Sequence, residues 1–256
     1  MTVLKHRTRP ENWSFVRKRA KYPWMVPFYG VEWALQWIAY LLSGWAFLEV
    51  LEYLGTLSLL LAVISYFSES RDRLKQKHYQ AWQVINSAQS KGGSGGRIDA
   101  LEELHADGVP LVGVDVSDAF LQGINLSGAD LLRANFSAAD VRGGDFSKSR
   151  LEFADLSSAN FRGANFRSAD LRKASLEDAD LNGADLSHSD LEGANLSKTD
   201  LRTADLGNCR WEKISDIKLA NILGIKNAPP GFEKWALEHG AVSVESDSDW
   251  QALISK

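Results

Sequence analysis

The chain of 256 residues is poor in the residues that build reactive or metal-binding sites. It has one cysteine, Cys209, which excludes an internal disulfide and a thiolate cluster. Its five histidines, at positions 6, 78, 105, 188 and 239, do not have the spacing of a metal-binding or catalytic motif. We therefore predict no catalytic residue, no metal ligand and no cofactor. We also expect no small-molecule substrate and no enzymatic activity.

Lysine and arginine are missing from a long stretch between Tyr22 and Arg71. Within this stretch, residues 31–67 are almost wholly apolar. As a single helix they would extend about 55 Å, whereas the hydrocarbon core of a bilayer is ~30 Å thick. They are too long for one upright span and barely enough for two. We predict an α-helical membrane anchor over residues 31–67, with a break at Gly55.

The two halves of this apolar stretch differ. Residues 53–67 carry no charge and are the better membrane span, whereas the first half contains Glu32, Glu49 and Glu52. The first half forms either a second short span or a helix in the interface, where tryptophan is enriched. The alternative is a tryptophan-rich buried helical pair in a soluble protein. The candidate anchor residues are Trp33, Trp37, Trp45, Leu59, Leu60, Leu61, Val63 and Ile64.

Positive charge flanks the apolar stretch on both sides. Residues 1–22 hold seven Lys and Arg against one Glu, and residues 69–78 hold four against two acids. Because positive flanks favour the cytoplasmic side, both ends are expected in the cytoplasm; a single span with the N-terminus inside is the alternative. The prediction is a basic segment over residues 1–30, a bacterial inner (plasma) membrane location with membrane lipid as a partner, and a juxtamembrane helix over 69–90. That helix either docks on a partner subunit or packs beside the membrane helices.

From residue 107 onward the apolar residues follow a period of five. All 21 positions from 111 to 211 at this interval are apolar, and the residue two before each is alanine in 13 cases. An α-helix would place residues five apart about 140° from each other, and a flat strand would send them to opposite faces. The chain must therefore turn once every five residues. Four such turns close a square coil of twenty residues.

Repeats such as "ADLLR", "ANFSA", "ANFRG", "ADLNG" and "ANLSK" resemble the pentapeptide-repeat proteins, whose consensus is A(D/N)LXX, over about residues 107–225. The stretch "RDRLKQKHYQAWQVINSAQS" and the "GGSGGR" after it are similar to a junction in membrane-linked bacterial, notably cyanobacterial, members of that family. The resemblance implies a mainly β fold, a right-handed quadrilateral β-helix, but no single function. The predicted fold is this β-helix with the N-terminal helical membrane segment and short capping helices.

The corners and ends of the predicted solenoid also have sequence signals. Gly123, Gly143, Gly163 and Gly183 lie twenty residues apart and suit a type II turn, whose third residue needs a positive φ. This column ends at Thr203, which leaves a change of turn type open there. After Trp211 the register slips by one, which predicts a bulge at residue 212 or 213.

Three further segments complete the predicted organisation. Residues 91–96, "KGGSGG", form a flexible linker. Residues 97–106 form an N-terminal capping helix with Ile98, Leu101 and Leu104 on one face. Residues 226–256 form the C-terminal cap, with a short helix at 232–239, because a solenoid needs its open ends covered.

Carboxylates stack in this solenoid because residues twenty apart become neighbours. Asp170 lies over Asp190, and Asp185 over Asp205. Such pairs could raise a pKa or hold a divalent cation, but the structural interpretation is a solvated, hydrogen-bonded ladder. The candidate interaction surface is one side of the solenoid with residues Asp140, Arg142, Arg162, Asp180, Asp200 and Arg202.

Charge on the solenoid is mixed. Residues 107–211 carry 17 acidic and 11 basic residues, a net charge of −6. A phosphate mimic needs a sustained acidic stripe, which the interleaved arginines interrupt. We expect a membrane-anchored, non-enzymatic scaffold that presents a rigid β-helix in the cytoplasm to an unidentified protein partner and binds no nucleic acid. The alternatives are a DNA-mimicking gyrase inhibitor, as soluble members of the family are, and an accessory subunit of a membrane transport or pore assembly.

Overall fold

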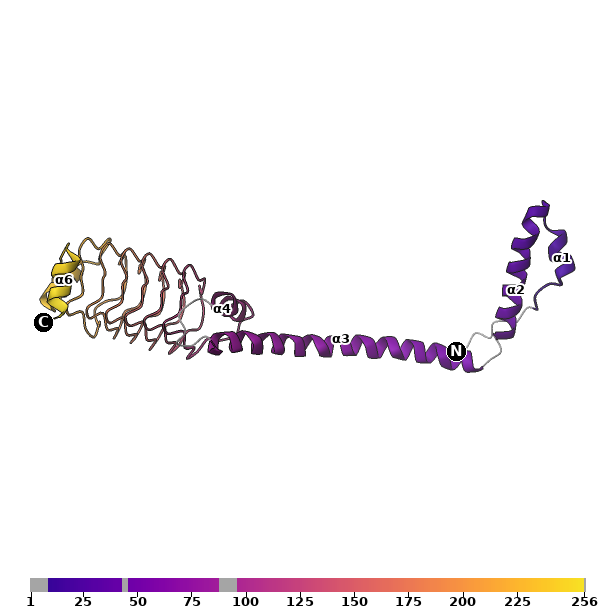
Figure 1. Cartoon of the computed structure of the whole chain (residues 1–256), viewed down its shortest axis with the longest axis horizontal. Helices are drawn as coiled ribbons and strands as arrows, with labels where there is room; N and C mark the ends of the chain where they lie inside the picture. Colours follow the sequence, from indigo (N-terminus) through magenta and orange to yellow (C-terminus); the bar gives the residue numbers. More distant parts are fainter. Residues whose placement is uncertain (1–8, 43–45, 88–95, 256) are drawn as a thin grey trace. The chain divides into compact units, whose positions relative to one another are not determined.

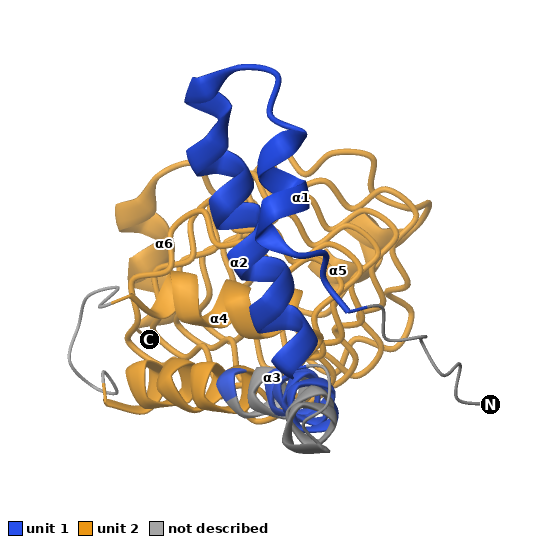
Figure 2. Cartoon of the chain, turned by 90° about the vertical axis from the view of Figure 1, so that its right-hand side faces the viewer, with its two compact units in different colours: residues 1–73 blue, residues 74–256 orange. Residues whose placement is uncertain are grey.

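The computed structural model describes residues 9–42, 46–87 and 96–255, without the side chains of residues 46–52 and 67–72. The chain divides into two compact units, Met1–Arg73 and Leu74–Lys256, shown in different colours in Figure 2. The 91–95 part of the predicted linker and the predicted anchor residue Trp45 lie outside the described residues.

The first unit consists of helices. They are α1 (Trp13–Lys18), the 3₁₀ helix η1 (Pro23–Met25), α2 (Val26–Leu42) and the first part of α3 (Ala46–Ser87). The ring of Trp13 lies 5.6 Å from that of Trp33, and the Trp33 indole donates a 2.8 Å hydrogen bond to the carbonyl of Glu11. No residue of α1 or α2 is buried.

The predicted membrane anchor is wrong. Among the described residues, none of the helices combines the length and the hydropathy that crossing a bilayer requires. Helix α2 has 17 residues, fewer than the ~20 of a typical span. This finding contradicts the anchor over residues 31–67 and the predicted membrane location. The predicted break at Gly55 is also wrong, because α3 continues through it.

In the second unit, the end of α3 packs against the helix that precedes the repeats. This unit also contains α4 (Arg97–Ala106), α5 (Phe232–Glu238) and α6 (Asp247–Ile254). Ile85 of α3 is fully buried in the same core as Leu101 and Leu104 of α4. The imidazole of His78 lies 2.9 Å from the carboxylate of Asp107. The segment predicted as a juxtamembrane helix thus packs, at its C-terminal end, on its own chain.

Residues 111–226, here called the coil, wind into stacked turns of twenty residues, or rungs (Figure 1). The predicted inward positions are confirmed: Leu156, Leu176 and Leu196 are at most 1% exposed. Each rung bonds to the next through the backbone. The N–H of Leu156, for example, donates to the carbonyl of Ser175 at 2.8 Å. Burial of each such leucine contributes about 2 kcal/mol, which offsets part of the cost of ordering the chain.

The predicted mainly β fold is wrong. In the part of the chain that the structure describes, the named elements are all helices, and the coil has no strand and no sheet. Its rungs are joined by isolated parallel bridges between single residues, such as Asn160 with Asp180. The reason is the spacing of the corners: a turn in every five residues leaves each side too short for a strand. The right-handed quadrilateral β-helix is therefore replaced by a coil of turns held by single bridges.

Every corner from residue 113 to residue 208 has a residue with positive φ. Gly163 has φ 64° at such a corner, but bulkier residues adopt the same conformation, including Phe153 at 59° and Thr203 at 58°. This conformation costs a residue other than glycine about 1–2 kcal/mol, so the stacked neighbours must enforce it. Because Thr203 keeps it, the corner does not change there.

The predicted bulge is confirmed. Bridged residues are 20 apart up to the pair of Asp190 and Arg210, and 21 apart from the pair of Asn195 and Asp216 onward. The N–H of Leu191 donates to the carbonyl of Arg210, nineteen residues later, whereas the N–H of Gly193 donates to Lys213, twenty residues later. The extra residue therefore lies between Arg210 and Lys213.

Candidate functional site

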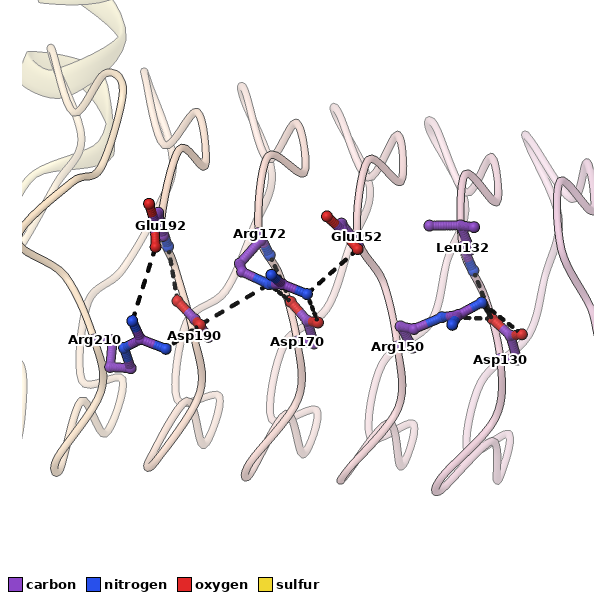
Figure 3. Close-up of polar contacts among 9 residues, drawn as sticks. All are labelled: Asp130, Leu132, Arg150, Glu152, Asp170, Arg172, Asp190, Glu192 and Arg210. Atoms are coloured by element: carbon purple, nitrogen blue, oxygen red, sulfur yellow. Dashed lines mark hydrogen bonds and ion pairs between the residues drawn. The ribbon is translucent and has the colours of Figure 1, made fainter.

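Two sides of the coil hold charged residues in stacked columns. The first, here called the Asp170 face, is drawn in Figure 3. Each rung contributes to this face up to two outward residues, two positions apart in the sequence. Its members are Asp130, Leu132, Arg150, Glu152, Asp170, Arg172, Asp190, Glu192 and Arg210.

Arg172 joins three rungs at the centre of the Asp170 face. Its guanidinium makes a bidentate pair with Asp170, with Nε–Oδ1 2.8 Å and Nη2–Oδ2 2.7 Å. The same group donates to Glu152 of the preceding rung at 3.3 Å and lies 4.0 Å from Asp190 of the next rung. The three acids converge on one cation (Figure 3).

The same pairing continues toward both ends of this face. Arg150 makes a bidentate pair with Asp130, at 2.9 and 2.7 Å, across one rung. Arg210 lies 2.7 Å from Asp190 and 3.8 Å from Glu192. Charges of both signs are therefore paired along the face, with side chains fixed by their neighbours.

These pairs lower carboxyl pKa values. The Arg172 hydrogen bonds hold the pKa of Asp170 below its ordinary value, although partial burial opposes the shift. The predicted possibility that stacked acids raise a pKa is therefore not found at Asp170. Among the described residues, no group of three or more His, Cys, Asp or Glu side chains has the arrangement of a metal site.

The second charged side, here called the Asp200 face, carries all six residues of the predicted interaction surface. Their stacking follows the bridges that join residues 140, 160, 180 and 200. Arg142 makes a bidentate pair with Asp140, at 2.8 and 2.7 Å. Arg162 reaches Asp180 of the next rung at 3.2 Å. Because the arginine follows its aspartate by two residues in two of the three pairs, the repeat itself places them in contact.

The third pair on this face is covered by a helix that the sequence pattern did not single out. Arg202 makes a bidentate pair with Asp200, at 2.9 and 2.6 Å. Asp247 and Trp250 of α6 also contact Arg202. The sequence did hold a signal for this helix, because a serine, Ser246, precedes it as an N-cap residue. In the structure its hydroxyl accepts from the N–H of Asp249 at 3.4 Å.

The predicted anchor residues are not gathered into a site. Trp33 and Trp37 of α2 are half-buried, and Trp37 packs against Tyr40 with ring centroids 5.8 Å apart. The α3 residues of this set are each more than half exposed: Leu59, Leu60, Leu61, Val63 and Ile64.

The single thiol is in an inert environment. Cys209 is 5% exposed at one of the small inward positions, and burial raises its pKa to about 12. Since the thiolate is the nucleophile, the protonated thiol is unreactive at neutral pH.

The fold and the charged faces define a repeat protein of stacked five-residue turns. The family model "Pentapeptide repeats" matches this chain in eight copies, over residues 111–147, 145–183 and 169–208. A pentapeptide repeat protein from the Arabidopsis thaliana thylakoid lumen is 32% identical over 43% of this chain and 81% of that chain, with a TM-score of 0.23. The chain belongs to the pentapeptide-repeat family.

The other similar solved structures include a pentapeptide repeat protein and a fluoroquinolone resistance protein. The protein Rfr23 from the cyanobacterium Cyanothece 51142 is 33% identical over 39% of this chain, with a TM-score of 0.23; the matched region spans 65% of Rfr23. QnrB1, a plasmid-mediated fluoroquinolone resistance protein, is 18% identical over 53% of this chain and 74% of its own, with a TM-score of 0.32. No curated protein matches this chain in sequence. The membrane-linked type of the family is not confirmed.

Proposed function

We propose that this protein is a non-enzymatic scaffold whose coil presents charged, pre-ordered faces to a protein partner. The observation that carries the proposal is the position of Arg172, which is held by Asp170, Glu152 and Asp190 from three successive rungs. Such a contact fixes the side chains of the Asp170 face before a partner arrives.

Pre-ordering matters because binding must otherwise immobilise long side chains, at about 0.5–1.5 kcal/mol each. The backbone beneath the face is also constrained, since the inward Leu171 and Leu191 are fully buried. A fixed pattern of alternating charge favours a partner with the complementary pattern and disfavours other partners through like-charge contacts. Selective protein recognition therefore fits this surface.

The two alternatives receive less support. A DNA mimic needs unpaired acids in a continuous stripe, whereas Asp130, Asp170 and Asp190 each contact an arginine. A subunit of a transport or pore assembly was suggested by acids within a membrane span, and that span is contradicted for the described helices.

The proposal is tested with a photo-reactive residue on the Asp170 face of the full-length chain. Leu132 suits this purpose because it is outward-facing and uncharged, so its replacement by benzoylphenylalanine leaves the ion pairs intact. Ser137 is the matched control, five residues later on a neighbouring side of the coil.

Irradiation in the cells that produce the protein should cross-link a distinct partner from position 132 and not from position 137. Reversal of the central charge, Arg172→Glu, should remove the adduct. Equal adducts from both positions, or no adduct from position 132, would contradict the proposed role of this face.

A further inference from the structure

Helix α6 contacts the Asp200 face through Trp250 and Asp247, and Trp250 is the more buried of the two. Trp250 is the buried residue of α6, at 6% exposure. Its indole N–H donates to the carbonyl of Leu219 at 2.8 Å, and its ring lies over the guanidinium of Arg202 at 5.7 Å. Tryptophan and arginine are enriched among the residues that contribute most to binding at protein–protein interfaces.

The arginine under this helix does not depend on α6 for its position. Its Nε and Nη2 atoms are held by Asp200, whose side chain is 6% exposed, and only Nη1 is directed at Asp247, at 2.6 Å. The Asp247 side chain is 76% exposed. The coil therefore provides a preformed receptor site, and Asp247 is the replaceable partner.

Helix α6 fills only part of the site. A cavity of about 260 Å³ lies between α6 and the coil, lined by Arg162, Asp178, Asp180, Asp200 and Gln251, among others. Arg162 is half exposed and reaches Asp180 at 3.2 Å. A longer helix would place a further side chain in this cavity, beside the paired Arg162 and Asp180.

We propose that α6 occupies, within its own chain, a docking site for an acidic helix of a protein partner. The chemistry of α6 specifies this partner: an aspartate that pairs with Arg202 and, three residues later, a tryptophan whose indole donates to the carbonyl of Leu219. The partner displaces α6 because it also fills the cavity that α6 leaves open. This inference rests on the proposed scaffold function and names the class of partner for the Asp200 face.

The test measures binding of a fluorescent peptide with the sequence of residues 245–256, "ESDSDWQALISK", to full-length chains by anisotropy. In the wild type, tethered α6 competes at a high effective concentration. Trp250→Ala removes the anchor of α6, so this variant should bind the peptide at least tenfold more tightly than the wild type. Asp247→Lys alters an exposed side chain, cannot disturb the core, and should give an intermediate gain.

Matched variants locate the site. In the Trp250→Ala chain, Arg202→Gln should abolish peptide binding, whereas Arg142→Ala, on the same face but outside the cavity, should leave it unchanged. A peptide with its tryptophan replaced by alanine should not bind.

Three outcomes would overturn the inference. Equal peptide binding by the wild type, Trp250→Ala and Asp247→Lys would mean that α6 is only a structural cap. Binding that does not need the peptide's tryptophan would remove the pocket. A wild-type dimer that Trp250→Ala dissociates in sedimentation would assign the site to a second copy. None of these outcomes affects cross-linking from position 132, so failure here is distinguishable from failure of the scaffold proposal.

Discussion

The coil and the N-terminal unit both contain many leucines and treat them in opposite ways. Leu156 in the coil is fully buried, whereas Leu60 in α3 is 59% exposed. In α3 the apolar residues follow one another, so they surround the helix and face all directions. In the coil they recur once in five residues, and each corner turns the next one inward. Spacing, more than abundance, therefore decides which leucines form a core.

The strongest test of this comparison replaces one leucine in each unit. Leu156→Ala should lower the free energy of unfolding of the coil by about 2–5 kcal/mol, because it leaves a cavity among buried neighbours. Leu60→Ala should change the free energy of unfolding of the N-terminal unit by less than about 0.5 kcal/mol. Urea unfolding measures both. Similar losses for the two variants would show that α3 also has a packed core.

A smaller effect is expected at Gly144, which occupies an inward position where most repeats have alanine. An added Cβ would lie 2.9 Å from Cε2 of Phe146 and 3.1 Å from the carbonyl oxygen of Val141. Gly144→Ala should therefore cost about 1–3 kcal/mol through overpacking.

Gly163→Ala provides the control, because its Cβ would point into open space and only its positive φ is strained, at about 1 kcal/mol. A thermal melt distinguishes the two variants. A neutral or stabilising Gly144→Ala would mean that the phenylalanine cluster is not tightly packed.

The ion pairs of the coil predict that its stability against urea depends on pH. Arginine partners hold the pKa values of Asp140 and Asp170 below their ordinary values. Such groups stabilise the fold fully above their unfolded pKa of about 3.9, and this stability is lost as pH falls through the lower folded pKa. The urea midpoint of the coil should therefore decrease below about pH 4.

Asp170→Asn should lower that midpoint at pH 7 and reduce its fall in acid. Glu11→Gln should change neither, because Glu11 and Arg19 form a pair that is more than half exposed on both sides. Identical acid profiles for Asp170→Asn and the wild type would show that the pair contributes no stability.

The smallest effect concerns reactivity without a change in stability. Cys209 should react with an aromatic disulfide reagent at pH 8 only as fast as the coil opens, because burial raises its pKa to about 12. A cysteine introduced by Leu60→Cys in a Cys209→Ser background should react at once. Rapid labelling of native Cys209 would place it outside the core.

Much of the coil could be predicted from the sequence because its rule is local. The inward leucines and the one-residue slip near residue 212 follow from a spacing of five, and glycine indicated the positive φ at one column of corners. The positive φ of non-glycine corners such as Phe153 had no such signal. The pairing of Arg142 with Asp140 follows in the same way, since the repeat places them two residues apart on one side. It was harder to predict that single-residue bridges replace strands, because the alternation of side chains around a bridge resembles that of a short strand.

Contacts between distant segments were not predictable. Trp250 meets Arg202 across 48 residues of sequence, and no repeat relates them. Ile85 of α3 packs with Leu101 across a linker, although its surroundings resembled a juxtamembrane helix. The apolar stretch of residues 31–67 was misinterpreted because its composition fits a bilayer, whereas none of the described helices has both the length and the hydropathy of a membrane span.

The central claim is that residues twenty apart are neighbours on the surface of the coil. In a Cys209→Ser background, oxidation of Asn160→Cys with Asp180→Cys tests it directly, because stacked bridge partners are about 4.8 Å apart and within disulfide reach. Asn160→Cys with Ser175→Cys, fifteen apart, is the control. The account predicts rapid cross-linking of the 160–180 pair and none of the 160–175 pair. Equal cross-linking of both pairs would contradict it.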